Sequence, residues 1–160
     1  MKHAASIGIR TVGTLVVLLL LHGCATQDSG PKPFPAAPPP QYALLFFYTQ
    51  RHDPGKGYPT LYIEGTSVAK LPHDSYTWCY VTPGPHVVRA IWQDEHASMN
   101  KHLDLEFKGG QTMFLRYLTK SHELMALRST FGIIDPVGPD LARHEIQDST
   151  YQRASKDVLP

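Results

Sequence analysis

Cysteine is almost absent from this chain, since its 160 residues include only Cys24 and Cys79. That count excludes the disulfide framework that many small secreted domains need. The sequence also contains no Cys-x-x-Cys, no His-Glu-x-x-His and no Gly-x-Ser-x-Gly. The common local signatures of structural zinc sites, zinc proteases and serine hydrolases are therefore missing.

An excess of charge of either sign is also missing. The chain has 15 basic and 14 acidic residues, and no run of like charges interrupts it. Nucleic-acid binding depends on a basic patch that neutralises phosphates. We therefore expect no nucleic-acid partner.

No apolar run is long enough to span a bilayer, which takes roughly 20 residues. The longest, residues 11–21, has no charged residue and follows Lys2 and Arg10. A basic start followed by a short apolar segment is typical of a secretory signal peptide. Without Lys2 and Arg10, 13 basic residues face 14 acidic ones, so the remaining chain carries a net charge of −1.

The apolar run ends in Leu21, His22, Gly23 and Cys24. This ending resembles the lipobox of bacterial lipoproteins, although that family usually has a small or β-branched residue in place of His22. The resemblance implies a signal peptide over residues 1–23, cleavage between Gly23 and Cys24, and a lipid on Cys24. It also implies a lipid-anchored envelope protein, and Ala25 in place of aspartate implies the outer membrane, facing the periplasm. The alternative is an ordinary signal anchor.

Residues 24–41 form a proline-rich linker that follows the lipidation site. Six prolines favour an extended polyproline II conformation, so we expect a spacer of up to roughly 50 Å without contacts to the domain. A proline motif that binds a partner is the alternative. With Cys24 lipidated, Cys79 has no partner, and we expect a buried, unreactive thiol rather than a catalytic one.

The rest of the chain is a series of short apolar segments separated by turn residues. We predict an all-β fold, an antiparallel β-sandwich of about seven strands of immunoglobulin or prealbumin type. The segments are residues 42–48, 60–64, 67–71, 75–82, 86–92, 103–107, 111–118 and 124–128.

Two hairpins are predicted from the turn residues. Gly65 and Thr66 connect the first, and Pro83 and Gly84 connect the second, between residues 75–82 and 86–92. We expect Gly84 to have a positive φ and the turn to determine strand register.

Strand 75–82 alternates most clearly, with Tyr76, Trp78 and Tyr80 on one face and Cys79 on the other. The aromatic face is either core or a sugar-binding or peptide-binding surface. Asp104 and Glu106 are interpreted as the solvated face of a strand that buries Leu103, Leu105 and Phe107. The sandwich domain is predicted over residues 42–130. An extension follows over residues 131–160, with one short helix on an edge or end of the sandwich, or an extended tail in its place.

Several turn and strand motifs together resemble a known family. They are residues 59–65, 68–71, Ser75 with Tyr76, residues 82–88, and Gly110 with Gln111 before Phe114 and Tyr117. The pattern is similar to the DUF2846-type bacterial lipoprotein domain, and more loosely to PEGA-like modules. The resemblance implies a β-sandwich in an envelope protein and brings no catalytic residues.

Nothing in the residues themselves names a reaction. The histidines after the leader do not have metal-ligand spacing, so we predict no metal site, no cofactor and no catalytic residues. They are His52, His73, His86, His96, His102, His122 and His144. The leading hypothesis is a non-enzymatic module that is anchored to the membrane through Cys24 and binds a protein or cell-wall partner. Two alternatives remain: a carbohydrate-binding domain that uses exposed aromatic residues, and an enzyme whose site assembles in space.

Overall fold

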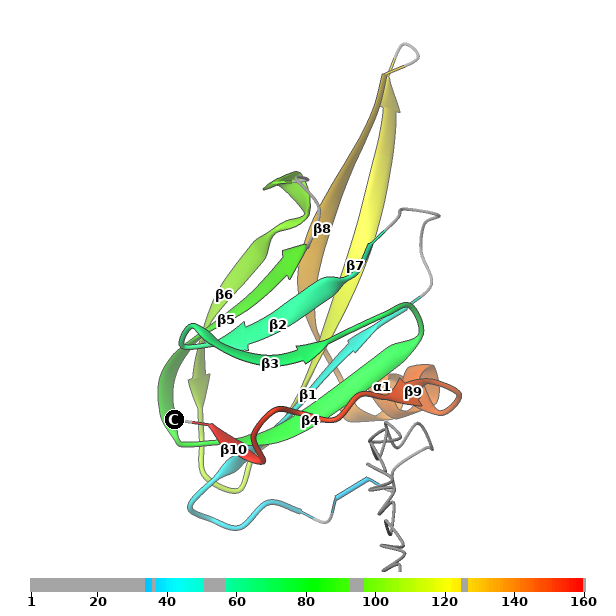
Figure 1. Ribbon diagram of the computed structural model, residues 1–160. Helices are drawn as coiled ribbons and strands as arrows, with labels where there is room; N and C mark the ends of the chain where they lie inside the picture. Colours follow the sequence, from blue (N-terminus) through cyan, green and yellow to red (C-terminus); the bar gives the residue numbers. More distant parts are fainter. Residues whose placement is uncertain (1–33, 36, 51–56, 93–96, 125–126, 160) are drawn as a thin grey trace, which may run out of the picture.

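The computed structural model describes residues 34–35, 37–50, 57–92, 97–124 and 127–159. The strands form two sheets that pack face to face, with one short helix on the far side of the larger sheet (Figure 1). The predicted β-sandwich is therefore confirmed, although the described residues form ten strands rather than about seven. The signal peptide and Cys24 lie outside the described residues.

The larger sheet, sheet A, has the strand order β10-β4-β1-β7-β8, with β9 also paired to β4. Its strands are β1 (Ala43–Thr49), β4 (Ser75–Val81), β7 (Thr112–Leu124), β8 (Leu127–Val137), β9 (Thr150–Tyr151) and β10 (Val158–Leu159). The smaller sheet, sheet B, has the order β3-β2-β5-β6. Its strands are β2 (Pro59–Ile63), β3 (Thr66–Lys70), β5 (Gly84–Trp92) and β6 (Lys101–Phe107), and a 3-10 turn at Ala97–Met99 precedes β6.

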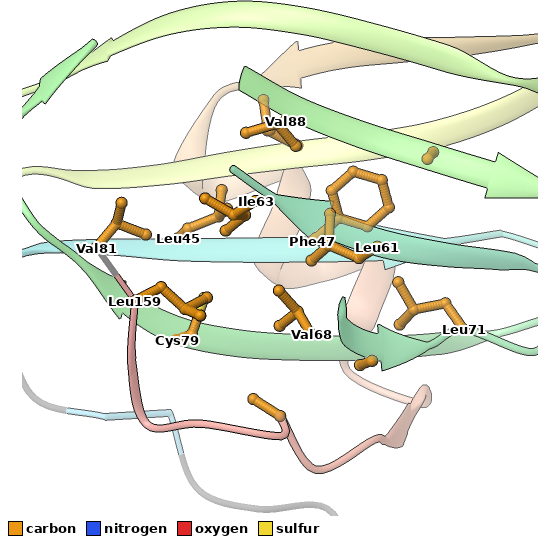
Figure 2. Packing of buried hydrophobic residues seen from close by; sticks show 14 of the residues in the cluster. Leu45, Phe47, Leu61, Ile63, Val68, Leu71, Cys79, Val81, Val88 and Leu159 are labelled. Carbon is orange, nitrogen blue, oxygen red and sulfur yellow. The ribbon is translucent and has the colours of Figure 1, made fainter. Parts of the chain in front are cut away.

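The strand β1 lies at the centre of sheet A and is buried along its whole length. Its inward residues join the core between the two sheets, while its outward residues join a second apolar layer. Figure 2 shows the inner core, where Leu45 and Phe47 pack with side chains of sheet B such as Leu61 and Val88. A continuous apolar sequence is what such a strand requires, as expected for residues 42–48.

The hairpin predicted through Pro83 and Gly84 is wrong. Strand β4 pairs with β1, β9 and β10 in sheet A, whereas β5 pairs with β2 and β6 in sheet B. The Pro83–Gly84 link thus carries the chain from one sheet to the other. Alternation predicted the buried position of Cys79 in β4, but it did not identify the strands that pair with β4. The positive φ of Gly84 is confirmed, at +126°.

The hairpin of β2 and β3 is confirmed, but its turn lies one residue earlier than predicted, at Glu64 and Gly65. Both residues have positive φ, of 47° and 75°, the geometry typical of a tight hairpin turn. The expectation that all strands are antiparallel is wrong for sheet A. There β7 is parallel to β1, and β9 and β10 are parallel to β4, pairings that each need a long crossover connection.

The last predicted strand, residues 124–128, is also wrong. These residues span the end of β7 and the start of β8, which form a long hairpin that projects beyond the sandwich (Figure 1). Strand β8 runs through the boundary predicted at residue 130, so the C-terminal extension completes sheet A. The sequence pattern hid β8 because Pro136 resembles a strand breaker, yet proline is tolerated on an edge strand such as this one.

The predicted short helix is α1 (Pro139–Ile146), which starts with Pro139 after Gly138 at the N-cap. It packs on the outer face of sheet A through Ala142 and Ile146, rather than on an edge or an end. The chain after it is extended: β9 and β10 pair with β4, and Ser155 donates its backbone N–H to Val68 of β3. The C-terminal segment therefore closes one open side of the sandwich.

We predict that Gly84→Ser destabilises the protein by about 1–3 kcal/mol, because a side chain is strained at positive φ. The matched control is Gly138→Ser, where φ is −65° and a Cβ has open space. A serine at this N-cap is expected to leave stability unchanged or to raise it by up to about 1 kcal/mol. Denaturant unfolding of both variants measures the difference. Equal losses would show that Gly84 does not control the crossing between the sheets.

Candidate binding surface on the outer side of sheet A

The outer side of sheet A carries a connected layer of aromatic rings, here called the outer aromatic layer. Strand β4 contributes Tyr76, Trp78 and Tyr80. Aromatic rings from neighbouring strands and from the segment before β1 pack against them. Neighbouring ring centroids lie 4.7–6.2 Å apart. The other members are Phe34, Tyr42, Phe46, Phe114 and Tyr151.

This layer is buried at one end and open at the other. Tyr76 is 2% exposed, whereas Trp78, Tyr80 and Tyr42 are half-buried. The aromatic face of β4 was interpreted as either core or binding surface. Tyr76 belongs to the core, whereas Trp78 and Tyr80 remain partly accessible. The outer aromatic layer therefore offers a half-exposed aromatic surface beside β10.

The second tryptophan does not contribute to this surface. Trp92 ends β5 in sheet B, is 6% exposed, and stacks on Tyr117 in the core between the sheets. A sugar-binding surface that combined the aromatic residues of strands 75–82 and 86–92 would need the predicted hairpin, which the structure does not form. Trp78 and Trp92 lie in different sheets, with Trp92 enclosed between them.

The linker contacts the domain, contrary to the predicted contact-free spacer. Phe34 stacks on Tyr76 at 6.2 Å and lies 5.2 Å from Phe46. Pro38 is buried, and a Cβ on Gly109 would collide with the carbonyl oxygen of Pro40. In Figure 1 this segment runs from the start of β1 back toward α1. We call residues 34–42, as far as they are described, the strap.

A polar cluster attaches α1 to the sheet beneath it. Glu145 of α1 accepts a hydrogen bond of 2.6 Å from the Tyr48 hydroxyl and another of 2.6 Å from Arg116 Nη1. Arg116 Nη2 also donates to Asp135 at 2.8 Å, so that the guanidinium joins α1 to β7 and β8. The side chains of Arg116 and Glu145 are 17% and 13% exposed.

The environment of this cluster determines the protonation states of Tyr48 and Arg116. Burial, followed by the hydrogen bond and the charge of Glu145, raises the pKa of Tyr48 far above its usual range. Burial lowers the pKa of Arg116, but Asp135 and Glu145 outweigh that effect and raise it. Tyr48 therefore stays a neutral donor and Arg116 a cation, which makes the cluster a structural attachment of the helix.

Neither this cluster nor the contact of Phe34 was predicted from the sequence. Arg116 interrupts an apolar strand between Leu115 and Tyr117, and a lone charge in such a run is a signal of a buried ion pair. Its partners lie 19 and 29 residues away. Without knowledge of where α1 packs, the spacing does not reveal them.

The described part of the chain has a small recess between the ends of several strands. It has a volume of about 10 Å³, which is room for roughly one water molecule. Its lining includes His73, Thr119 and Gln50. A recess of this size does not enclose a substrate.

The remaining candidate residues lie apart from one another. Cys79 is 0% exposed, as predicted, and burial raises its pKa to about 12, which keeps the thiol protonated. His86 is buried, with Nε2 2.9 Å from the carbonyl oxygen of Thr82 and Nδ1 3.7 Å from Glu64. The other described histidines are exposed: His73, His102, His122 and His144. His52 and His96 lie outside the described residues.

Two further results concern the described residues alone. Nowhere in these ranges do three or more His, Cys, Asp or Glu side chains come close enough to hold a metal ion together. The helical segments in the same ranges include none with the length and apolar character needed to cross a bilayer. The exposed positions of Asp104 and Glu106 agree with their interpretation as a solvated strand face, and Phe107 is buried as expected.

We predict that Arg116→Leu lowers the free energy of unfolding by about 2–3 kcal/mol, because it leaves Glu145 and Asp135 without their cation. Arg143→Leu is the matched control, since Arg143 is exposed on α1, and a change of at most about 0.5 kcal/mol is expected. Denaturant unfolding of both variants gives the comparison. Similar losses for the two variants would contradict the assigned role of the cluster.

Comparisons with known proteins do not assign this chain to a family. A scan against protein-family models matched none, and searches of the curated proteins and of the solved structures each found no match. The DUF2846-type resemblance therefore stays a prediction, and the case for a function depends on the residues and their geometry.

Proposed function

We propose that this chain is a membrane-anchored lipoprotein of the bacterial envelope, and that its sandwich is a non-enzymatic interaction module for a protein or cell-wall partner. The signal peptide ends at Gly23, and Cys24 carries the lipid. Ala25 supports sorting to the outer membrane, facing the periplasm. The membrane is thus the first partner of the protein.

The observation that carries the proposal is the difference between the two outer surfaces of the sandwich. The outer side of sheet A is aromatic and half-exposed beside β10. Sheet B instead exposes charged side chains such as Arg89, Asp104 and Glu106. Two surfaces of different character support recognition by surfaces.

A carbohydrate or peptidoglycan ligand is the second candidate. It is favoured by the half-exposed rings of Tyr42, Trp78 and Tyr80, of which the two tyrosines lie 6.0 Å apart and Trp78 lies 6.0 Å from Tyr80. The accessible face of an aromatic ring is an apolar surface on which a sugar ring can stack, although these rings are tilted to one another by 41° and 70°. Trp92 does not take part, because it is enclosed between the sheets.

We predict that Cys24→Ser abolishes lipid attachment. The variant should incorporate no labelled palmitate, and it should move from the detergent phase to the aqueous phase in a detergent partition experiment. Cys79→Ala is the matched control, because Cys79 is a buried thiol of the core. It should take up label and partition like the unchanged protein.

Normal processing, labelling and detergent-phase recovery of Cys24→Ser would contradict the anchor assignment. Loss of label in both variants would show that the effect is due to misfolding. Near-ultraviolet circular dichroism of the purified variants identifies that case, because the aromatic packing gives the folded protein a distinct signal.

A further inference from the structure

Exposed apolar side chains gather on one side of the molecule. Four large hydrophobic residues are prominently exposed in the described part of the chain, and three of them belong to the outer side of sheet A or to α1 above it. They are Phe34 at 41%, Val158 at 41% and Leu141 at 50%, whereas Ile91 at 36% belongs to sheet B. Val158 pairs with Tyr80, so both side chains point to the same side of the sheet.

The strap brings the chain into the domain on this same side. Tyr42 lies 6.0 Å from Tyr80, and the Tyr42 carbonyl accepts a hydrogen bond of 2.8 Å from Gly110 N–H. Phe34 holds the other end of the strap on Tyr76 and Phe46. The partial burial of Phe34 and its ring contacts stabilise this arrangement.

The strap shortens the tether between the lipid and the domain. Residues 25–33 separate Cys24 from Phe34, a span of at most about 36 Å even when fully extended. Residues 25–41 would instead have given the spacer of roughly 50 Å expected from the proline content. The outer aromatic layer is therefore held within a short distance of the bilayer that contains the lipid.

We propose that the outer aromatic layer, with Val158 beside it, rests on the headgroup region of the bilayer that anchors Cys24. The inference builds on the proposed lipoprotein function and adds the orientation of the domain. Tyrosine rings such as those of Tyr42 and Tyr80 prefer this interface, because one end of the ring is apolar and the other carries a hydrogen-bond donor. Trp78 contributes the accessible part of its ring, while its indole nitrogen is buried. A tether of this length keeps the surface at high local concentration near the lipid, so a weak contact suffices.

The charges around this surface are balanced, which favours an apolar rather than an electrostatic contact. Three exposed basic residues and three exposed acidic ones lie on α1 and along the chain after it. They are Arg143, Arg153 and Lys156, and Asp140, Asp148 and Asp157. The membrane contact should therefore depend little on salt concentration. The charged side of sheet B then points away from the bilayer, toward a partner.

The two tryptophans provide an internal test. In Trp92→Phe the remaining tryptophan is Trp78 of the outer aromatic layer, and in Trp78→Phe it is the enclosed Trp92. Each lipidated full-length variant is incorporated into phosphatidylethanolamine–phosphatidylglycerol vesicles, with or without brominated acyl chains. We predict that bromine quenches Trp78 several-fold more than Trp92, and that Phe34→Ala in the Trp92→Phe background weakens the quenching of Trp78.

A second probe covers the case in which a tryptophan variant does not fold. Val158→Cys and Asp104→Cys, on opposite outer sides of the sandwich, are labelled with an environment-sensitive fluorophore. The Cys79 thiol is buried and does not compete for the label. On vesicles, the emission at position 158 should increase and shift to the blue, whereas the emission at position 104 should stay as in buffer.

The outcomes separate the orientation from the anchor. If the lipidated protein floats with the vesicles but Trp78 and position 158 respond no more than Trp92 and position 104, the proposed orientation is overturned and the anchor stands. If the lipidated protein does not float with vesicles, the proposed function fails instead. If Trp78 is unaffected by vesicles but becomes shielded by soluble peptidoglycan fragments, the surface is a glycan site and the membrane contact is rejected.

Discussion

The burial of β1 on both faces is the constraint on which the rest of the structure depends. Seven consecutive residues, Ala43–Thr49, are buried, so sheet A needs a cover on each side. Sheet B packs on the inner side, and α1 packs on part of the outer side through Ala142 and Ile146. Each fully buried large side chain of this strand contributes roughly 1.5–3 kcal/mol. The cluster around Arg116 orients the outer cover, because Glu145 joins α1 to the sheet through two hydrogen bonds.

Helix α1 covers only part of the outer side of sheet A, and the uncovered part is the candidate binding surface. Helix α1 is eight residues long, and beside β10 the outer aromatic layer stays half-exposed. The strap adds Phe34 to this layer and so joins the linker to the same side of the sheet. In the proposed orientation, an anchor at Cys24, a short tether and this aromatic surface together hold the domain at a membrane. The charged surface of sheet B is then the proposed surface for partners.

Features that depend on neighbouring residues were predicted from the sequence. Contacts between segments far apart in the chain were not. The all-apolar segment of β1, the alternation around Cys79 and the positive φ of Gly84 were each recognisable from neighbouring residues. The pairing of the strands could not be recognised in this way, because the same alternation is compatible with a hairpin and with a crossing between two sheets. The ion pair of Arg116 and the contact of Phe34 depend on where α1 and the linker come to rest. Cys24, which carries the proposed anchor, lies outside the described residues.

Native-state hydrogen exchange tests the two-sided burial of β1 most directly. The central amides of this strand, from Leu44 to Tyr48, pair with β4 on one side and β7 on the other. The structure predicts that they exchange only when the whole domain unfolds, with the free energy of opening equal to the free energy of global unfolding measured with denaturant. Amides of β6, at the edge of sheet B, should exchange with a lower free energy of opening. Exchange of the β1 amides at the rate of α1, well below the global free energy, would show that the outer cover opens independently and would contradict this description of the fold.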